Sequence, residues 1–244
     1  MKAPKVLLLA AGKSTRIAEV SGGVPKPLLK VGDGAIIEHN LDWLAAQGVT
    51  SVFINLHYRP EDIQSALGDG RRYGVSITWS HEPTILGTAG AWKHLAAQLG
   101  TPSLVIYGDN LFRFDIGALL ATHAAGSALA TLALFDQTTH VHTGIAGGRV
   151  EIAKGRVTGF VEGKPESTSS TLVNAGAYAL DAALARDIGD GFQDFGRDVF
   201  PGLVGGGRVS AHIIEPEGYC LGLDTPESYA TAQRLVQSQG VSLR

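Results

Sequence analysis

Cysteine is nearly absent from this sequence: Cys220 is the only one among 244 residues. A single cysteine excludes an internal disulfide and a zinc site built on several cysteines. The chain also lacks any apolar run near the roughly 20 residues that a membrane-spanning helix needs. Its first residues lead into a strand pattern without the apolar core of a signal peptide. We therefore expect a cytoplasmic protein with no membrane partner.

The chain also lacks a large excess of positive or of negative charge. Twenty lysines and arginines oppose 23 acidic residues, which gives a net charge of −3. So nearly neutral a chain offers no broad basic surface to nucleic acid, and any cations that bind phosphate must act locally. The hydrophobic fraction of 44% is enough for one sizeable core. We expect residues 1–244 to form a single domain, and a homo-oligomer stays open.

Strand and helix patterns alternate through the first half of the chain. Strands are predicted at residues 6–10, 51–56, 75–79 and 104–107, and helices at 36–47, 61–67 and 89–99. This order predicts an α/β fold with a largely parallel sheet, whose strand C-termini meet at one ligand-binding edge. The second half predicts strands at 128–134, 156–161, 172–180 and 209–214, a hairpin at Gly147-Gly148, and helices at 181–187, 194–203 and 226–238.

A basic loop follows the first strand, and a second basic turn at residues 24–28 contains Lys26. The loop consists of Ala10, Ala11, Gly12, Lys13, Ser14, Thr15 and Arg16. Free N–H groups in such a loop bind phosphates, and the two cations Arg16 and Lys26 suit a polyphosphate. The loop is neither a P-loop, which needs a glycine at position 7, nor a dinucleotide fingerprint, which needs one at position 14. An ordinary strand-to-helix turn is the alternative.

Acidic residues stand at two further junctions. Asp109 ends the fourth strand pattern, and Asp224 precedes the last helix. Because Mg²⁺ binds one or two carboxylates together with phosphate oxygens, the two acids could share one magnesium ion. Each acid could equally cap the segment that follows it.

Other candidate groups are weaker. Glu162 and Lys164 end the strand at 156–161, where lysine suits a phosphate monoester and glutamate suits sugar hydroxyls, but a solvated strand end is the commoner case. His140 and His142 could chelate a metal, although no third ligand is near in the sequence. No G-x-S-x-G elbow is present to support acyl transfer.

Six short motifs occur in one order along nearly the whole chain. They read LAAGKSTR at 9–16, PKPL at 25–28, LGTAGA at 86–91, GD at 108–109, EGKP at 162–165 and VNAGAY at 173–178. In this order they resemble the sugar-1-phosphate nucleotidylyltransferases, and in particular the mannose-1-phosphate and heptose-1-phosphate guanylyltransferases. Ser14 replaces the family's second glycine, and Gly163 is an insertion.

The resemblance implies a Rossmann-like three-layer α/β/α fold with a mixed, mostly parallel central sheet. Residues 1–110 would form the nucleotide-binding half and 111–244 the sugar-phosphate-binding half. Aligning on Thr225-Pro226 puts Gly222 where many members have a metal-binding acid. Asp224-Thr225-Pro226-Glu227 looks instead like the D-T-P-E form of related cytidylyltransferases, in which that acid still reaches the metal.

The resemblance also implies a reaction in which a nucleoside triphosphate and a sugar 1-phosphate give a nucleotide-sugar and pyrophosphate, with Mg²⁺ as cofactor. The catalytic residues would be Arg16, Lys26 and Asp109, with Asp109 and Asp224 on the metal. The nucleotide would contact residues 10–15, Glu82, Gly87 and Thr88, and the sugar phosphate would contact Asn110, Glu162, Lys164 and Asn174. The attacking phosphate oxygen is ionised near neutral pH, so no general base is needed.

The identity of the base stays open at this point. Glu82 could accept hydrogen bonds from the adjacent N–H donors of guanine, which favours GTP and a mannose- or heptose-type acceptor. If Glu82 is simply exposed to solvent, UTP, CTP and dTTP are equally acceptable. Two further alternatives are a non-catalytic sensor of nucleotide-sugars and a cytidylyltransferase for an aminoalcohol phosphate.

Overall fold

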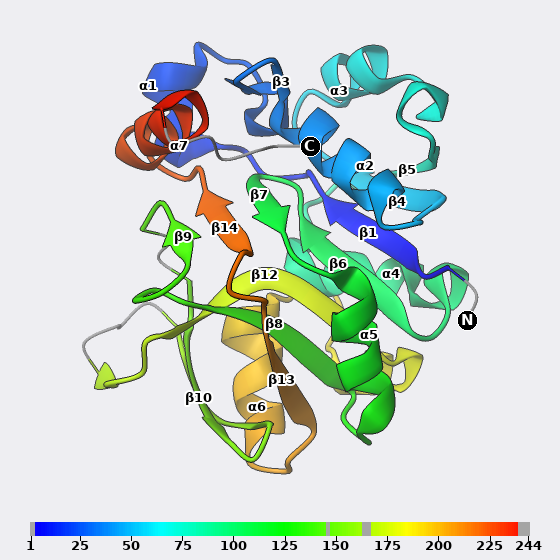
Figure 1. Cartoon of the computed structure of the whole chain (residues 1–244). Coiled ribbons are helices and arrows are strands. Elements are labelled where there is room, and N and C mark those ends of the chain that lie inside the picture. The colour runs from blue at the N-terminus through cyan, green and yellow to red at the C-terminus, as the bar shows by residue number, and fades with distance from the viewer. Residues whose placement is uncertain (1–2, 145–146, 163–166, 239–244) are drawn as a thin grey trace.

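A nine-stranded sheet forms the centre of the molecule (Figure 1). The computed structural model describes residues 3–144, 147–162 and 167–238. In spatial order the strands are β10 (Arg149–Ala153), β11 (Arg156–Val161), β13 (Val209–Ile213), β8 (Ala130–Asp136), β12 (Leu172–Leu180), β6 (Ser103–Tyr107), β1 (Lys5–Leu9), β4 (Ser51–Leu56) and β5 (Ser76–His81). One sheet therefore joins strands from both halves of the chain.

The parallel part of the sheet is the one that the first half of the sequence predicts. Strands β6, β1, β4 and β5 are all parallel, with Leu9 opposite both Tyr107 and Asn55. Helices connect these strands, as parallel neighbours require. The C-terminal ends of β1, β4 and β6 consequently lie together at one edge.

The prediction of a mostly parallel sheet is wrong for the sheet as a whole. Four of the eight neighbouring strand pairs in the described residues are antiparallel, beginning where β12 lies between β6 and β8. The predicted hairpin at Gly147-Gly148 is also misplaced. The turn between β10 and β11 lies at Lys154 and Gly155, which both adopt left-handed φ angles, 50° and 74°. Such a two-residue turn joins antiparallel strands directly, which a parallel crossover cannot do.

Helices cover both faces of the sheet. The α-helices are α1 (Ala18–Ser21), α2 (Ile36–Ala46), α3 (Pro60–Leu67), α4 (Gly87–Leu99), α5 (Ile116–Ala125), α6 (Phe200–Val204) and α7 (Pro226–Ser238). Alternate side chains of β1 point to opposite faces. Val6 and Leu8 pack in the core cluster of α2, α3 and α5, whereas Leu7 and Leu9 pack in that of α4 and α6. In Figure 1, α2 and α5 lie in front of the sheet and α4 lies behind it.

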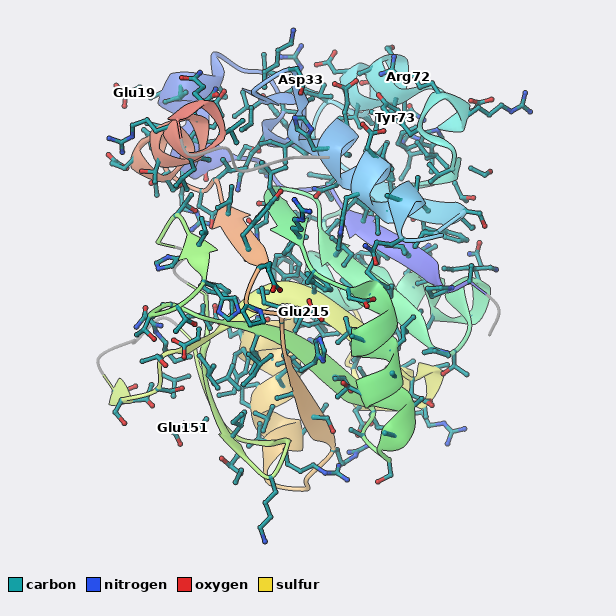
Figure 2. All side chains as sticks on the ribbon, viewed as in Figure 1. Glu19, Asp33, Arg72, Tyr73, Glu151 and Glu215 are labelled. Atoms are coloured by element: carbon teal, nitrogen blue, oxygen red, sulfur yellow. The ribbon has the colours of Figure 1, made fainter. Side chains whose placement is uncertain are left out.

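Part of the surface of α2 is tied to the turn before β5 by a small polar cluster. Glu38 on α2 accepts hydrogen bonds from Arg72 and Tyr73, each over 2.7 Å, and the latter two are labelled in Figure 2. The other carboxylate oxygen of Glu38 accepts from the Ala35 N–H and caps the helix. In the described part of the chain, no helix has the length and apolar character needed to cross a membrane.

A second, small sheet brings distant parts of the chain together. It consists of β7 (Asn110–Arg113), β14 (Tyr219–Gly222) and β9 (Val141–His142). Strands β7 and β14 lie side by side and antiparallel, with Gly222 opposite Asn110 (Figure 1). Asp109 comes just before β7 and Asp224 comes just after β14. Their strand pairing therefore places the two acids next to each other.

Candidate active site

One cavity of about 340 Å³ lies at the C-terminal edge of the parallel strands. Its lining includes the whole basic loop after β1, together with Lys26, Gly87, Thr88, Asp109 and Asp224. Arg16 and Asp109 thus face a common cavity, as the sequence predicts. The cavity is also lined by Asn55, Ile85, Tyr107, Phe192 and Asp194, none of which belongs to the residues predicted for the site from the sequence.

The loop after β1 is held in place at both ends. At its start, the Ala10 N–H donates to Oδ1 of Asn55 over 2.9 Å. Ser14 adopts a left-handed conformation, with φ 55° and ψ 32°, at the position where the family has glycine. Its hydroxyl accepts a hydrogen bond from the Lys26 N–H over 3.2 Å. Ser14 therefore ties the basic loop to the second basic turn.

Lys26 is the centre of a charged cluster. Its Nζ lies 2.8 Å from Oδ2 of Asp109 and 2.6 Å from Oδ1 of Asp224, and its side chain is only 4% exposed. Arg16, which is 67% exposed, reaches the same Asp224 oxygen over 3.3 Å. Burial lowers the pKa of Lys26, but the charges and hydrogen bonds of the two carboxylates outweigh this and raise it above 10.5. The ammonium is therefore charged at neutral pH.

The same carboxylates form a donor set that fits Mg²⁺. Oxygens of Asp109 and Asp224 converge on one cation, the ammonium of Lys26, and Mg²⁺ in phosphate sites takes one or two carboxylates with the remaining positions left to water and phosphate. The described residues contain no group of three or more histidine, cysteine or acidic residues able to hold a metal by themselves. His140 and His142 instead direct their Nε2 atoms to backbone carbonyls.

Glu82 is held by hydrogen bonds inside the protein. It is buried, at 4% exposure, so the solvent-exposed alternative is wrong. Its Oε1 accepts from Nδ2 of Asn55 over 2.8 Å, and its Oε2 accepts from the Leu86 N–H over 2.9 Å. Among the described residues it is not part of the cavity lining. Both carboxylate oxygens are thus directed to protein donors.

The segment that contains Gln193 covers the N-terminus of α4. The Ala89 and Gly90 N–H groups donate to the carbonyl of Gln193 over 2.9 and 3.1 Å. Gly87 has φ +74°, and a Cβ there would lie 2.4 Å from the same carbonyl oxygen, so only glycine fits. This contact brings Phe192 and Asp194 to the cavity. No local sequence pattern marks them, because a tertiary contact places them.

Thr88 and Asn174 are connected by a series of hydrogen bonds through tyrosine hydroxyl groups. The Thr88 hydroxyl donates to Oδ2 of Asp194 over 2.9 Å, and Asn174 donates to the Tyr178 hydroxyl over 2.8 Å. Tyr107 hydrogen-bonds to both Thr88 and Tyr178, and burial raises its pKa, which keeps it neutral. Among the described residues, Asn174 does not line the cavity itself.

The remaining predicted sugar-phosphate residues are only partly placed. Glu162 Oε2 lies in a notch between two glycines: a Cβ at Gly148 or at Gly196 would approach it to 2.6 Å. Burial and the nearby charge of Asp194 raise the pKa of Glu162. Asn110 begins β7, and its carbonyl accepts from Asn40 over 2.8 Å. Lys164 and the inserted Gly163 lie outside the described residues.

Comparisons with known proteins identify the family of the chain. The sequence model of the family described as nucleotidyl transferase matches residues 5–239. Mannose-1-phosphate guanyltransferase of Schizosaccharomyces pombe is 30% identical over 238 residues, which are 96% of this chain and 64% of that protein. Mannose-1-phosphate guanylyltransferase of Mycobacterium tuberculosis is 29% identical over 91% of this chain and 62% of that protein. The chain thus spans slightly less than two thirds of the length of these curated relatives.

A solved structure supports the fold. A protein of Bacillus anthracis described as a glucose-1-phosphate thymidylyltransferase superposes with a TM-score of 0.82, covering 97% of this chain and 96% of that one. The two sequences are 23% identical, so the likeness concerns the mixed α/β fold alone.

Proposed function

Because the chain belongs to the nucleotidyl transferase family, we propose that it transfers a nucleoside monophosphate from a nucleoside triphosphate to a sugar 1-phosphate. The products are a nucleotide-sugar and pyrophosphate. One observation carries the proposal: two cations, Arg16 and Lys26, and two acids, Asp109 and Asp224, converge on one cavity beside the loop after β1.

The proposed chemistry needs positioning and charge neutralisation. An oxygen of the acceptor phosphate attacks the α-phosphorus of the triphosphate, and the bond from this phosphorus to the oxygen bridging to the β-phosphorus breaks. The attacking oxygen is already ionised, so no side chain has to remove a proton. Arg16 and Lys26 neutralise the negative charge of the phosphates, while N–H groups of residues 11–15 supply fixed dipoles at the same edge.

We propose Mg²⁺ as the cofactor, held by Asp109 and Asp224. The support is the convergence of their oxygens on a single cation within 2.8 Å. Bound there, the metal ion would add positive charge next to the phosphates. Lys26 and Arg16 would then serve the phosphates beside the metal ion.

The two halves of the chain take different substrates in this proposal, within a single nucleotidyltransferase domain of Rossmann-like three-layer architecture. Core clusters on opposite faces of the sheet support that architecture. Residues 1–110 bind the nucleotide through the loop after β1, Gly87 and Thr88. Residues 111–244 bind the sugar phosphate, with Glu162 in its glycine notch as the hydroxyl acceptor and Asn174 placed through Tyr178.

For the substrates we propose GTP and a mannose-type sugar 1-phosphate. The support comes from the two relatives described above, which align over more than nine tenths of this chain and are named as guanylyltransferases for mannose 1-phosphate. Glu82 gives no support to the choice of guanine, since its oxygens are directed to Asn55 and Leu86.

The test is a pyrophosphate-release assay with Mg²⁺. Each of GTP, UTP, CTP and dTTP is combined with mannose 1-phosphate, glucose 1-phosphate, a heptose 1-phosphate and an aminoalcohol phosphate. We expect release with GTP and mannose 1-phosphate that stops when the metal is chelated. Release with another pair would keep the reaction class and change the substrates. Tight binding of a nucleotide-sugar without turnover on any pair would identify a sensor and refute the catalytic proposal.

A further inference from the structure

Two buried polar side chains connect opposite walls of the cavity. Asn55, 2% exposed, is the penultimate residue of β4, and Glu82, 4% exposed, follows β5. The Ala10 N–H donates to Asn55, Asn55 donates to Glu82, and the Leu86 N–H donates to Glu82, over 2.9, 2.8 and 2.9 Å. We call these two side chains the Asn55–Glu82 bridge.

The bridge runs between two segments that hold substrate in the proposed function. Ala10 starts the loop after β1, and Leu86 precedes Gly87 at the start of α4. The backbone of Glu82 is itself fixed, because its N–H donates to Leu56 over 2.8 Å and its carbonyl contacts the His57 ring over 2.8 Å. A shift of either wall therefore has to stretch a hydrogen bond of the bridge.

The backbone N–H groups at the two ends of the bridge fix which of its atoms must accept a hydrogen bond and which must donate one. Both of its ends meet backbone N–H groups, which can only donate, so each end must present an acceptor. Asparagine supplies one acceptor and one donor, and an ionised glutamate supplies two acceptors. The reversed arrangement, an aspartate at 55 and a glutamine at 82, would satisfy the same pattern. Neither single exchange can without a change in protonation: E82Q alone opposes two donors, and N55D alone opposes two carboxylate oxygens, which can pair only by taking up a proton.

We propose that Asn55 and Glu82 are positioning residues that set the spacing between the phosphate loop and the start of α4, and that Glu82 does not read the base. The proposal rests on the proposed nucleotidyl transfer. Mismatching the bridge should weaken nucleotide binding, and restoring its polarity should rescue it even though the carboxylate has moved from position 82 to position 55.

The experiment is a double-mutant cycle with N55D, E82Q and N55D/E82Q. Affinity for GTP with Mg²⁺ is measured by calorimetry, the preference for GTP over UTP by competition, and the melting temperature separately. Ser103→Ala is the matched control. It removes the buried hydrogen bond from Trp92 to Ser103, 3.0 Å long, at the far end of β6. This control should lower the melting temperature and leave nucleotide affinity unchanged.

We expect each single exchange to weaken GTP binding by about tenfold or more, since either leaves a buried polar group mismatched. The double variant should return to within about threefold of the wild type, with an unchanged base preference. If N55D does not fold, comparing the GTP affinity of E82Q with that of the double variant still tests the rescue. Loss of GTP preference in both variants that carry E82Q would show that Glu82 reads the base. Lower melting temperatures with unchanged affinity would show a merely structural role, and either result overturns the proposal.

Hydrogen–deuterium exchange separates this proposal from the proposed function. Protection of the Ala10 and Leu86 amides should fall in both single variants and recover in the double, with no nucleotide present. If the wild type binds no nucleotide, the proposed function fails while the exchange data still test the bridge. If protection does not recover in the double variant, the bridge itself is refuted.

Discussion

Replacing Lys26 with methionine tests the charged cluster most directly. The substitution keeps an unbranched apolar side chain but removes the ammonium that contacts Asp109 and Asp224. Taking one partner out of a buried ion pair costs about 3–5 kcal/mol. Here the two carboxylates are 35% and 26% exposed and keep part of their hydration. We therefore expect a loss of about 2 kcal/mol in the free energy of unfolding at neutral pH.

The loss should depend on pH in a defined direction. The pKa of Lys26 in the folded protein is raised above its ordinary value of 10.5. A raised lysine pKa contributes stability that is complete below the unfolded value and disappears as the pH rises through the folded value. The difference between wild type and Lys26→Met should thus be largest at neutral pH and shrink above about pH 10.5. Urea unfolding at a series of pH values measures it.

The same variant separates the structural and catalytic roles of the ammonium. Turnover should fall by at least on the order of 10² because a cation is removed from the reacting phosphates. Without nucleotide, Mg²⁺ should stabilise Lys26→Met more than the wild type, since no ammonium competes for the two carboxylates. Lys30→Met, at an exposed lysine nearby, is the control. Near-normal turnover in Lys26→Met, or equal stabilisation by Mg²⁺ in both proteins, would refute the reasoning.

Three further substitutions test other parts of the site. Asp109→Asn should lower kcat on the order of 10², measured by pyrophosphate release, because it removes a metal-binding charge. Ser14→Ala should be less stable in urea than Ser14→Gly by about 1 kcal/mol, since both lose the bond to Lys26 but only glycine relieves the left-handed strain. Gly196→Ala should raise KM for the sugar 1-phosphate several-fold without changing KM for the nucleotide, because its Cβ would displace Glu162.

Each of these has an outcome that contradicts it. Asp109 would have no catalytic role if the asparagine variant turned over normally. The strain argument for Ser14 fails if the alanine variant is as stable as the glycine variant. For the glycine notch, Gly202→Ala is the control, because among the described residues the added Cβ would have nothing within 4 Å beyond its chain neighbours and the backbone of its own helix. If Gly202→Ala raised the KM for the sugar 1-phosphate as much as Gly196→Ala, the contact between residue 196 and Glu162 would not explain the effect.

The sequence predicted which loops meet at the cavity, for a physical reason. Strands β1 and β6 are parallel neighbours, so the segments that follow them, which contain Arg16 and Asp109, have to meet at one sheet edge. The apolar runs that mark those strands are local in the sequence. The order of the motifs and strands along the chain therefore predicted which loops meet at this edge.

Residues outside the motifs were found only in the structure. Phe192 and Asp194 reach the cavity because Gln193 bonds to the start of α4, which is a contact across about a hundred positions of sequence. Asn55 did leave a local signal, since it is a polar residue inside the apolar strand Ser51–Leu56. A buried amide in such a strand has to find partners, and its partners are Ala10 and Glu82. The solvent-exposed alternative for Glu82 was wrong, because its side chain is buried and bonded to Asn55 and to the Leu86 N–H.

Strand register determines which of two aligned positions, Gly222 or Asp224, reaches Lys26. One alignment puts Gly222 at the family's metal position, and the other puts Asp224 there. Gly222 lies opposite Asn110 in the ladder of β7 and β14, and its carbonyl accepts the Thr143 hydroxyl over 2.5 Å. Asp224 follows where the ladder has ended, so its side chain is free to turn toward Lys26. An acid at 222 would lie inside the strand pairing, and the acid two residues later reaches the cation because β14 stops at Gly222.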